Sequence, residues 1–402
     1  MLECFFESVI AHPCTRQIPE ILNPITMRLS WLVFAGSAIA SLWQDQVVLG
    51  TESTPQLKSE TEISLLEFHK NLVTIPSVSG NELAVAKYLG SYLKSLNLTV
   101  EYQKVTKNRY NVYAYLGNKR NTTVLLTSHI DTVPPYLPYK VEGSRIYGRG
   151  STDAKASVAV QVFAFAQMAA KKVIGEGDVG LLYVVGEEVD GRGMVTASES
   201  LGAQWEAAIF GEPTELKLGV GHKGAYIVNV LVNGTAAHSG YPELGVSATE
   251  TLVPLLAQML NAEWPTSKLL GPSTLNIGKI DAGVAANVIP AHAEAQCFVR
   301  VAADLEAVDK TMTSILSGHK NVKYQVLTKV EPQYLDYQVP GFESIVLAYA
   351  TDIPHMHLQL QKRYLYGPGT IHVAHGANEY VEIQDLYDGV DGYTRLIRHC
   401  LE

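Results

Sequence analysis

Short apolar runs that end directly in a histidine or an acid constrain this chain more than any other feature. TVLLTS leads into His129 and Asp131, GLLYVVG leads into Glu187 and Glu188, and AAIFG leads into Glu212. Helical patterns separate these runs, so they predict a central, mostly parallel sheet covered by helices on both faces. The carboxyl ends of parallel strands meet at one sheet edge, where α/β proteins bind ligands. The pattern therefore predicts an α/β fold with one polar site at that edge.

Two groups of elements follow from the spacing of apolar residues. The first has helices over 60–74, 81–96 and 155–170 and strands over 100–105, 110–116, 123–127, 180–185 and 207–210. The second begins near residue 222 and reads strand, helix, strand, strand, helix, strand over 225–233, 248–260, 273–280, 293–301, 304–316 and 322–328. This β-α-β-β-α-β order is that of a ferredoxin-like unit. Further helices are expected over 342–351 and 383–401, back in the first group.

These patterns predict one domain over 59–221 and 331–402, interrupted by an inserted domain over 222–330. A G-x-G-x-x-G match at Gly219–Gly224 would otherwise suggest a dinucleotide site. It leads into a strand pattern, whereas the dinucleotide fingerprint requires a helix, so we interpret these glycines as a hinge.

The polar residues at the sheet edge form a ligand set of nitrogen and oxygen atoms without cysteine. Asp153 joins them, because the glycine-rich segment YGRGST presents it just before a helix. Such a set suits Zn²⁺ and accepts Co²⁺ or Mn²⁺. Several carboxylates in one cleft repel each other unless cations are bound, which favours two metal ions. Taken singly, each acid could instead be a solvated charge at a loop end.

Six motifs in sequence order resemble the dinuclear zinc amidohydrolase and carboxypeptidase family. They are SHIDTVP (128–134), GRGSTDAK (148–155), GEEVDGRG (186–193), FGEPT (210–214), AAHSGYP (236–242) and HGANE (375–379). The family includes acetylornithine deacetylase, succinyl-diaminopimelate desuccinylase, aminoacylase-1 and glutamate carboxypeptidase. The resemblance covers about residues 60–402, and the GRGSTDAK motif and the start of the chain are most similar to those of the secreted fungal carboxypeptidases of the family.

The resemblance implies a dizinc centre in which Asp153 bridges the two ions. His129 and Glu188 would each bind one ion, and Glu212 and His375 would complete the two ligand sets. The family pattern of His, two residues and Asn-Glu favours His375, although IHVAH also offers His372 as an alternative ligand.

Three further residues are expected to act in catalysis. On an extended segment adjacent acids point to opposite sides, so Glu187 can take a proton from water while Glu188 binds metal. Asp131 is expected to accept a hydrogen bond that fixes the His129 imidazole. The resemblance implies that His238 stabilises the tetrahedral oxyanion, in cis or from the partner subunit of a homodimer formed by the inserted domain.

Asn287 and Arg300 resemble the family's anchor for the substrate carboxylate, and arginine suits bidentate carboxylate recognition. As alternatives, Arg300 could be a surface residue and Asn287 could shape the turn before Pro290. Because this anchor and the metals lie on different predicted domains, closure of 222–330 is expected, with hinges near 221–224 and Pro332.

The start of the chain predicts a secreted protein. The segment that begins at Met27, MRLSWLVFAGSAIASLWQ, has the form of a signal peptide ending near Ala40. Residues 1–26, which precede this segment, are interpreted as an over-extended start. Three sequons place glycans on Asn97, Asn121 and Asn233. After signal removal no membrane association is expected.

Two function classes remain. Lys and Arg number 31 against 40 Asp and Glu, and a net charge of −9 argues against nucleic acid as a partner. The favoured class is a secreted hydrolase that releases a C-terminal residue from a peptide or deacylates an N-acyl amino acid. The alternative is a non-catalytic metal-binding scaffold, which would not require Glu187.

Overall fold

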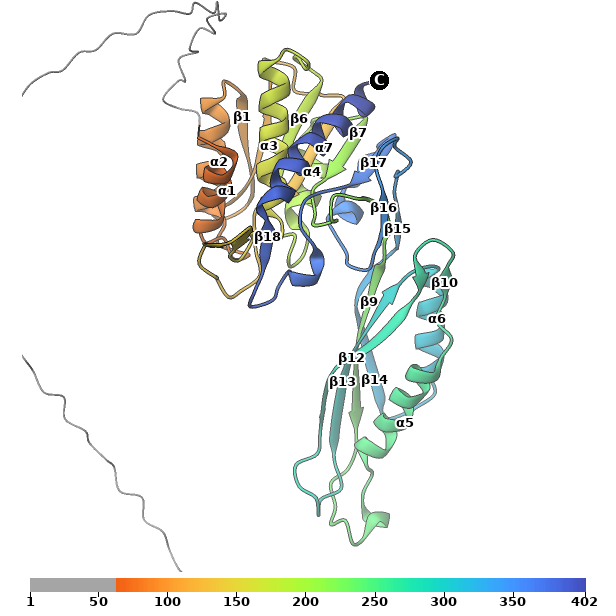
Figure 1. The fold of residues 1–402 in the computed structure, drawn as a ribbon. Coiled ribbons are helices and arrows are strands. Elements are labelled where there is room, and N and C mark those ends of the chain that lie inside the picture. The colour runs from red at the N-terminus through yellow and green to blue at the C-terminus, as the bar shows by residue number, and fades with distance from the viewer. Residues whose placement is uncertain (1–62) are drawn as a thin grey trace, which may run out of the picture. The chain divides into compact units, whose positions relative to one another are not determined.

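The computed structural model describes residues 63–402, and its centre is a six-stranded, mostly parallel sheet (Figure 1). Four neighbouring strands run parallel. The other two, at one edge, pair antiparallel. In spatial order the strands are β1 (Thr99–Thr106), β2 (Arg109–Tyr115), β6 (Val179–Val184), β3 (Val124–His129), β7 (Ala207–Phe210) and β17 (Lys362–Leu365). The predicted α/β fold class is confirmed.

Both faces of this sheet are buried because its strands are apolar at consecutive positions. In β3, Val124 and Leu126 join one core, while Leu125 joins the core of the opposite face. The first core is closed by α1 (Leu65–Thr74), α2 (Leu83–Ser95), α3 (Lys155–Ala170) and α7 (Ile383–Leu401). The second contains residues of α4 (Arg192–Ser200). Helices therefore lie on both faces, as the run pattern predicts.

A second sheet of four antiparallel strands has its own apolar core, which it shares with two helices. Its strands are β12 (Thr274–Ala282), β13 (His292–Val301), β9 (Gly224–Asn233) and β14 (Val322–Val330), and its helices are α5 (Ala248–Asn261) and α6 (Leu305–Leu316). We call these six elements the four-stranded unit. Their order along the chain is the predicted β-α-β-β-α-β order, while the division into domains stays a prediction.

The predicted helix over 342–351 is wrong. The chain there forms β16 (Ser344–Leu347), which pairs parallel with β8 (Leu218–His222). The β-branched pair Ile345 and Val346 favours a strand, and the neighbouring strand provides the hydrogen-bond partners that the local pattern could not reveal. The helix predicted over 383–401 forms with those bounds as α7.

The remaining short strands and helical turns connect the larger elements. They are β4 (Lys140–Glu142), β5 (Arg145–Tyr147), β10 (Thr266–Ser267), β11 (Gly271–Pro272), β15 (Gln333–Tyr334), β18 (Tyr380–Glu382), η1 (Pro242–Leu244), η2 (Ile353–His355) and η3 (Ile371–Val373).

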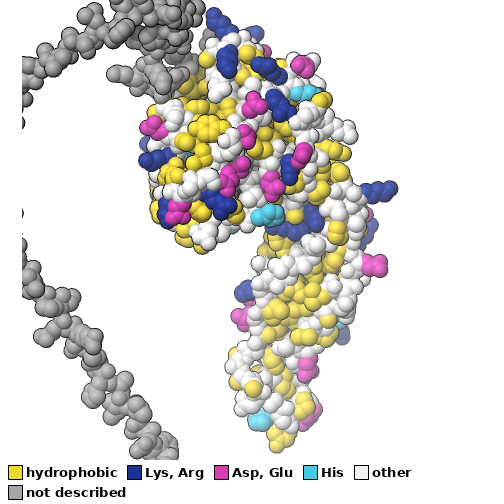
Figure 2. Space-filling model, in the orientation of Figure 1, with side chains coloured by type: hydrophobic (Ala, Val, Ile, Leu, Met, Phe, Trp, Pro, Cys, Tyr) yellow, Lys and Arg dark blue, Asp and Glu magenta, His cyan; other side chains and the backbone are white. Residues whose placement is uncertain are grey.

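The surface in Figure 2 carries acidic and basic side chains interspersed over the face shown, without a continuous area of one sign. Within residues 63–402, no helix is both long and apolar enough to span a bilayer. The predicted signal peptide and over-extended start lie outside the described residues.

Candidate metal centre and active site

The polar residues predicted at the sheet edge come together in one cluster, in which His129, Asp153 and Glu212 are buried while His375 is half exposed. His129 is the last residue of β3, and Glu212 lies two residues beyond β7. Asp153 lies two residues before α3, and Glu187 and Glu188 lie in the turn that follows β6. A sixth residue, His375, comes from the loop between η3 and β18. The topology therefore collects the cluster at the carboxyl ends of parallel strands.

Distances divide the cluster into two donor groups that share Asp153. In the first group, His129 Nε2 lies 3.0 Å from Asp153 Oδ1 and 3.7 Å from Glu212 Oε1. In the second, His375 Nε2 lies 3.1 Å from Asp153 Oδ2 and 3.0 Å from Glu188 Oε2. Each oxygen of Asp153 thus faces a different histidine.

The donor groups fit two divalent cations. Both contain imidazole and carboxylate donors, the combination that zinc accepts. Glu188 Oε1 is buried without a hydrogen-bond partner in the described part of the chain, so one of its lone pairs is free for a cation. Ligand atoms of His129, Asp153 and Glu188 lie within 4.8 Å of one another, as do those of His129, Glu187 and Glu212, so the two donor groups are close together.

The electrostatics of the cluster reflect its surplus of negative charge. Burial raises the pKa of both Glu187 and Glu212 well above the usual range, and neighbouring carboxylates raise both further. Burial alone would lower the pKa of His129, but Glu212, Asp153 and Glu187 together raise it well above its usual value. Bound cations would offset the same charge, which is the reason to expect them here.

His375, and not His372, reaches the cluster. His375 adopts a left-handed backbone conformation with φ of 62°, and its ring contacts Asp153 and Glu188. Hydrogen bonds to these two carboxylates raise the pKa of His375 to about 10. His372 lies exposed in η3, and its backbone amide donates to the Thr370 hydroxyl.

Asp131 contacts the His129 imidazole through its backbone and not through its side chain. Its backbone carbonyl, not its carboxylate, lies 3.0 Å from His129 Nδ1, while the nearest carboxylate oxygen lies 3.7 Å away. The carboxylate instead accepts hydrogen bonds from the amides of Glu187 and Glu188, at 3.2 and 3.3 Å. The backbone carbonyl of Asp131 is therefore the group placed to orient the imidazole.

Glu187 and Glu188 lie in a turn and not on the extended segment assumed in the prediction. Gly186 begins this turn with φ of 83°, and its carbonyl accepts the amide of Gly191 at 2.8 Å. The two side chains nevertheless diverge. Glu187 Oε2 lies 3.9 Å from His129 Nε2, whereas Glu188 contacts His375.

Glu379 lies in the HGANE motif but was not among the predicted site residues. Its carboxylate accepts hydrogen bonds from the amides of Gly150, Thr152 and Asp153, at 2.9 to 3.2 Å. It also pairs with the buried guanidinium of Arg149 at 2.5 Å. Glu379 thus holds the backbone that carries Asp153. Its position in the HGANE motif is the sequence feature that could have identified it as a site residue.

Asp352 was missed because no motif marks it. It lies in the loop after β16, is 5% exposed, and has one carboxylate oxygen without a partner among residues 63–402. Burial raises the pKa of Asp352 to about 8, against the opposing effect of the nearby His129.

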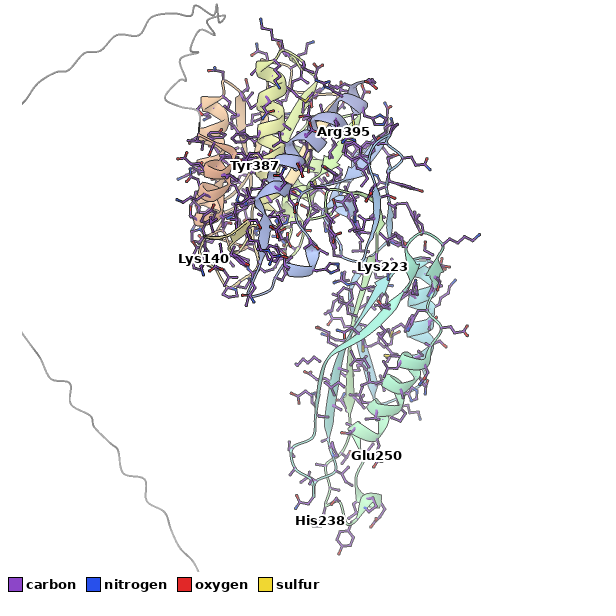
Figure 3. All side chains as sticks on the ribbon, viewed as in Figure 1. Lys140, Lys223, His238, Glu250, Tyr387 and Arg395 are labelled. Atoms are coloured by element: carbon purple, nitrogen blue, oxygen red, sulfur yellow. The ribbon has the colours of Figure 1, made fainter. Side chains whose placement is uncertain are left out.

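His238 lies at one end of the four-stranded unit and Lys223 at the other (Figure 3). His238 is exposed, and its Nδ1 accepts the amide of Gly240 at 3.0 Å. Asn287 belongs to the same end, because its carbonyl accepts the amide of Ser239 at 3.0 Å. No contact within residues 63–402 joins His238 to the metal cluster.

Within one chain, Arg300 and Asn287 lie at opposite ends of the four-stranded unit. Arg300 pairs with Ala225 in β9, at the end of the unit near Lys223. Arg300 and His292 are eight positions apart along β13, which corresponds to about 26 Å of strand. The structure therefore does not bring the predicted anchor pair together within one chain. Arg300 packs over Phe298, 4.2 Å from the ring centre, and has no acidic partner in the described chain.

Sequence comparison gives a family match and curated relatives. The model described as peptidase family M20/M25/M40 matches residues 125–399. A Peptidase M20 domain-containing protein of Schizosaccharomyces pombe is 49% identical over 366 residues, covering 89% of this chain and 91% of the relative. A probable carboxypeptidase of Aspergillus niger is 39% identical over 408 residues, covering 92% and 97%.

Solved structures share the fold. An M20 family metallo-carboxypeptidase from Sulfolobus solfataricus has a TM-score of 0.69 at 16% identity, covering 84% of this chain and 99% of that one. A dinuclear metal binding peptidase from Bacillus subtilis has a TM-score of 0.60 at 14% identity, covering 83% and 96%.

Proposed function

The chain belongs to peptidase family M20/M25/M40, and we propose that it is a secreted dizinc carboxypeptidase acting on an amide bond beside a free carboxylate. It is thus a hydrolase of the peptidase class, and metal binding is consistent with its donor cluster. The observation that carries the finer proposal is a partly buried acid, Glu187, beside two donor groups that share Asp153.

We propose two zinc ions, each held by three residues of the cluster. His129, Asp153 and Glu212 form one set, and Asp153, Glu188 and His375 form the other. When bound, the ions supply positive charge that polarises the scissile carbonyl and makes a nearby water molecule more acidic.

Glu187 supplies the proton transfer in this proposal. Its side chain is 14% exposed, and its Oε2 lies 3.9 Å from His129 Nε2. Glu187 takes a proton from the attacking water and delivers it to the leaving amine. A scaffold that only binds metal has no use for this acid, which is why we favour an enzyme.

Arg300 is proposed to bind the substrate's carboxylate. It is a half-buried cation without an acidic partner in residues 63–402, and burial lowers its pKa. Burying a charge is unfavourable unless it is paired, so the site favours an anionic ligand. A carboxylate can accept two parallel hydrogen bonds from a guanidinium.

His238 and Asn287 are proposed to act together on the oxyanion side of the reaction. They share one end of the four-stranded unit, whereas Arg300 lies at the other end. This separation supports delivery of His238 from the partner subunit of a homodimer. A peptide or an N-acyl amino acid is the proposed substrate, and we propose no nucleic acid or membrane partner.

Turnover of a panel of dipeptides and N-acyl amino acids, with and without chelator, tests the function. Arg300→Met should lower kcat/KM by about 10- to 150-fold for substrates with a free carboxylate, and much less for their amides. Equal losses on both would remove Arg300 as the anchor. If no substrate of the panel shows chelator-sensitive turnover, the non-catalytic metal-binding scaffold is the function that remains. Faster turnover of N-acyl amino acids than of peptides would make it a deacylase.

A further inference from the structure

We propose that Ser79 is a positioning residue for the general base, acting through Asp131; this inference rests on the proposed function. Ser79 lies in the loop between α1 and α2, far in sequence from every predicted site residue. Its hydroxyl donates a hydrogen bond of 2.7 Å to Asp131 Oδ2.

The carboxylate of Asp131 holds the turn that carries the base. Its Oδ1 accepts the Glu187 amide at 3.2 Å, and its Oδ2 accepts the Glu188 amide at 3.3 Å. The Ser79 bond is the shortest of the three, so it contributes most to fixing the rotation of the carboxylate. The start of the turn therefore depends on the loop before α2.

The loop that carries Ser79 is itself held firmly. Backbone bonds of 3.1 and 3.0 Å join Ser79 N to Thr132 O and Thr132 N to Ser77 O. The amide of Gly80 donates to Glu82 Oε1 at 2.8 Å, and Glu82 is in turn buried against Arg109. Ser79 is thus a fixed donor, and a fixed donor can set a geometry where a mobile one cannot.

The same loop provides a matched control. Ser77 is two residues away and 1% exposed, and its hydroxyl has no hydrogen-bond partner in the described part of the chain. Ser77→Ala removes an identical group from the same loop without touching Asp131. Any difference between the two alanine variants therefore reports the Ser79–Asp131 contact.

Two measurements on the full chain test the proposal. In the metal-loaded protein, Ser79→Ala should lower kcat by about tenfold with KM unchanged, at the lower end of what losing a hydrogen bond to a charged group costs. Ser79→Thr keeps the hydroxyl and should recover most of the rate, while Ser77→Ala should match wild type. Metal content by elemental analysis should be unchanged in all variants.

Amide hydrogen exchange gives a readout that does not need activity. Exchange over residues 186–191 should be at least fivefold faster in Ser79→Ala than in Ser77→Ala, because the Glu187 and Glu188 amides lose a fixed acceptor. Unchanged exchange, or equal losses in both alanine variants, would overturn the proposal. Faster exchange with an unchanged kcat would also overturn it. If wild-type protein hydrolyses nothing, the proposed function fails, and exchange alone decides the contact.

Discussion

A single residue, Asp153, determines how the donors of the cluster divide. Its two oxygens face different histidines, so each donor group depends on it. Hydrogen bonds from His129 and His375 lower the pKa of Asp153 in spite of its burial. Few substitutions elsewhere could affect both donor groups at once.

Asp153→Ala is expected to lose metal as well as activity, because the shared carboxylate serves both donor groups. Elemental analysis of purified protein measures the number of ions per chain. Glu187→Gln is the control, since it leaves all five proposed ligands in place. Two ions retained in Asp153→Ala would assign the bridge to another residue.

Glu187→Gln is expected to fold normally and keep its metal but lose about 10²- to 10⁴-fold in turnover, the usual value of a general base. Steady-state kinetics and thermal melting of the same preparation check this. Turnover within threefold of wild type would show that another group transfers the proton.

His69 makes the fold sensitive to acid. The ring is fully buried, with Nε2 3.0 Å from Ser151 O, and burial lowers the pKa of His69 to about 4. In the unfolded chain the pKa is about 6.5, so between these values the unfolded state binds more protons. Stability is therefore full above pH 6.5 and falls as the pH drops towards 4.

For His69, the loss at pH 5 should be about 2 kcal/mol. His69→Asn is expected to lower overall stability but to show a correspondingly smaller change between pH 7.5 and pH 5. Urea unfolding at both values measures the difference. An identical pH dependence in both proteins would contradict the assignment.

Among the elements, α4 controls the position of the turn that carries Glu187. Gly193, in the first turn of α4, packs directly on the backbone of Val185, the residue after β6. Its amide donates to Val185 O at 3.0 Å, and its carbonyl accepts Asn111 Nδ2 at 2.8 Å. The close approach requires a residue without a side chain.

Gly193→Ala is expected to destabilise the protein by about 1 to 3 kcal/mol, because the new methyl group overlaps the Val185 backbone. Urea unfolding measures the change. Gly175→Ala is the control, since the nearest atom to its new methyl is 3.8 Å away. Equal stability of the two variants would show that α4 moves aside freely.

For the whole molecule, we predict that the protein is exported from the cell. The mature protein is expected to begin near residue 41 and to carry glycan on at least one of Asn97, Asn121 and Asn233. All three side chains are exposed in the structure, so each is accessible to modification. Mass spectrometry of secreted protein measures both features. A mature chain that still contains Cys4 would refute the over-extended start.

The spacing of apolar residues was sufficient to predict the sheet, most helices and the cluster residues that directly follow strands. Strands buried on both faces are continuous apolar runs, and a charged residue directly after such a run lies at the sheet edge by topology alone. The choice of His375 over His372 came from the resemblance of HGANE to the family pattern. These signals are local, so a single sequence contains them.

Features that depend on contacts between distant segments could be found only in the folded protein. The local sequence of β16 predicts a helix, but the segment forms a strand that pairs with β8. Strand pairing and not local propensity selects its conformation. The roles of Glu379, Asp352 and Ser79, and the carbonyl contact of Asp131, depend on distances between residues far apart in the chain. Asn287 and Arg300 are thirteen residues apart in sequence, but an extended strand places them at opposite ends of one sheet.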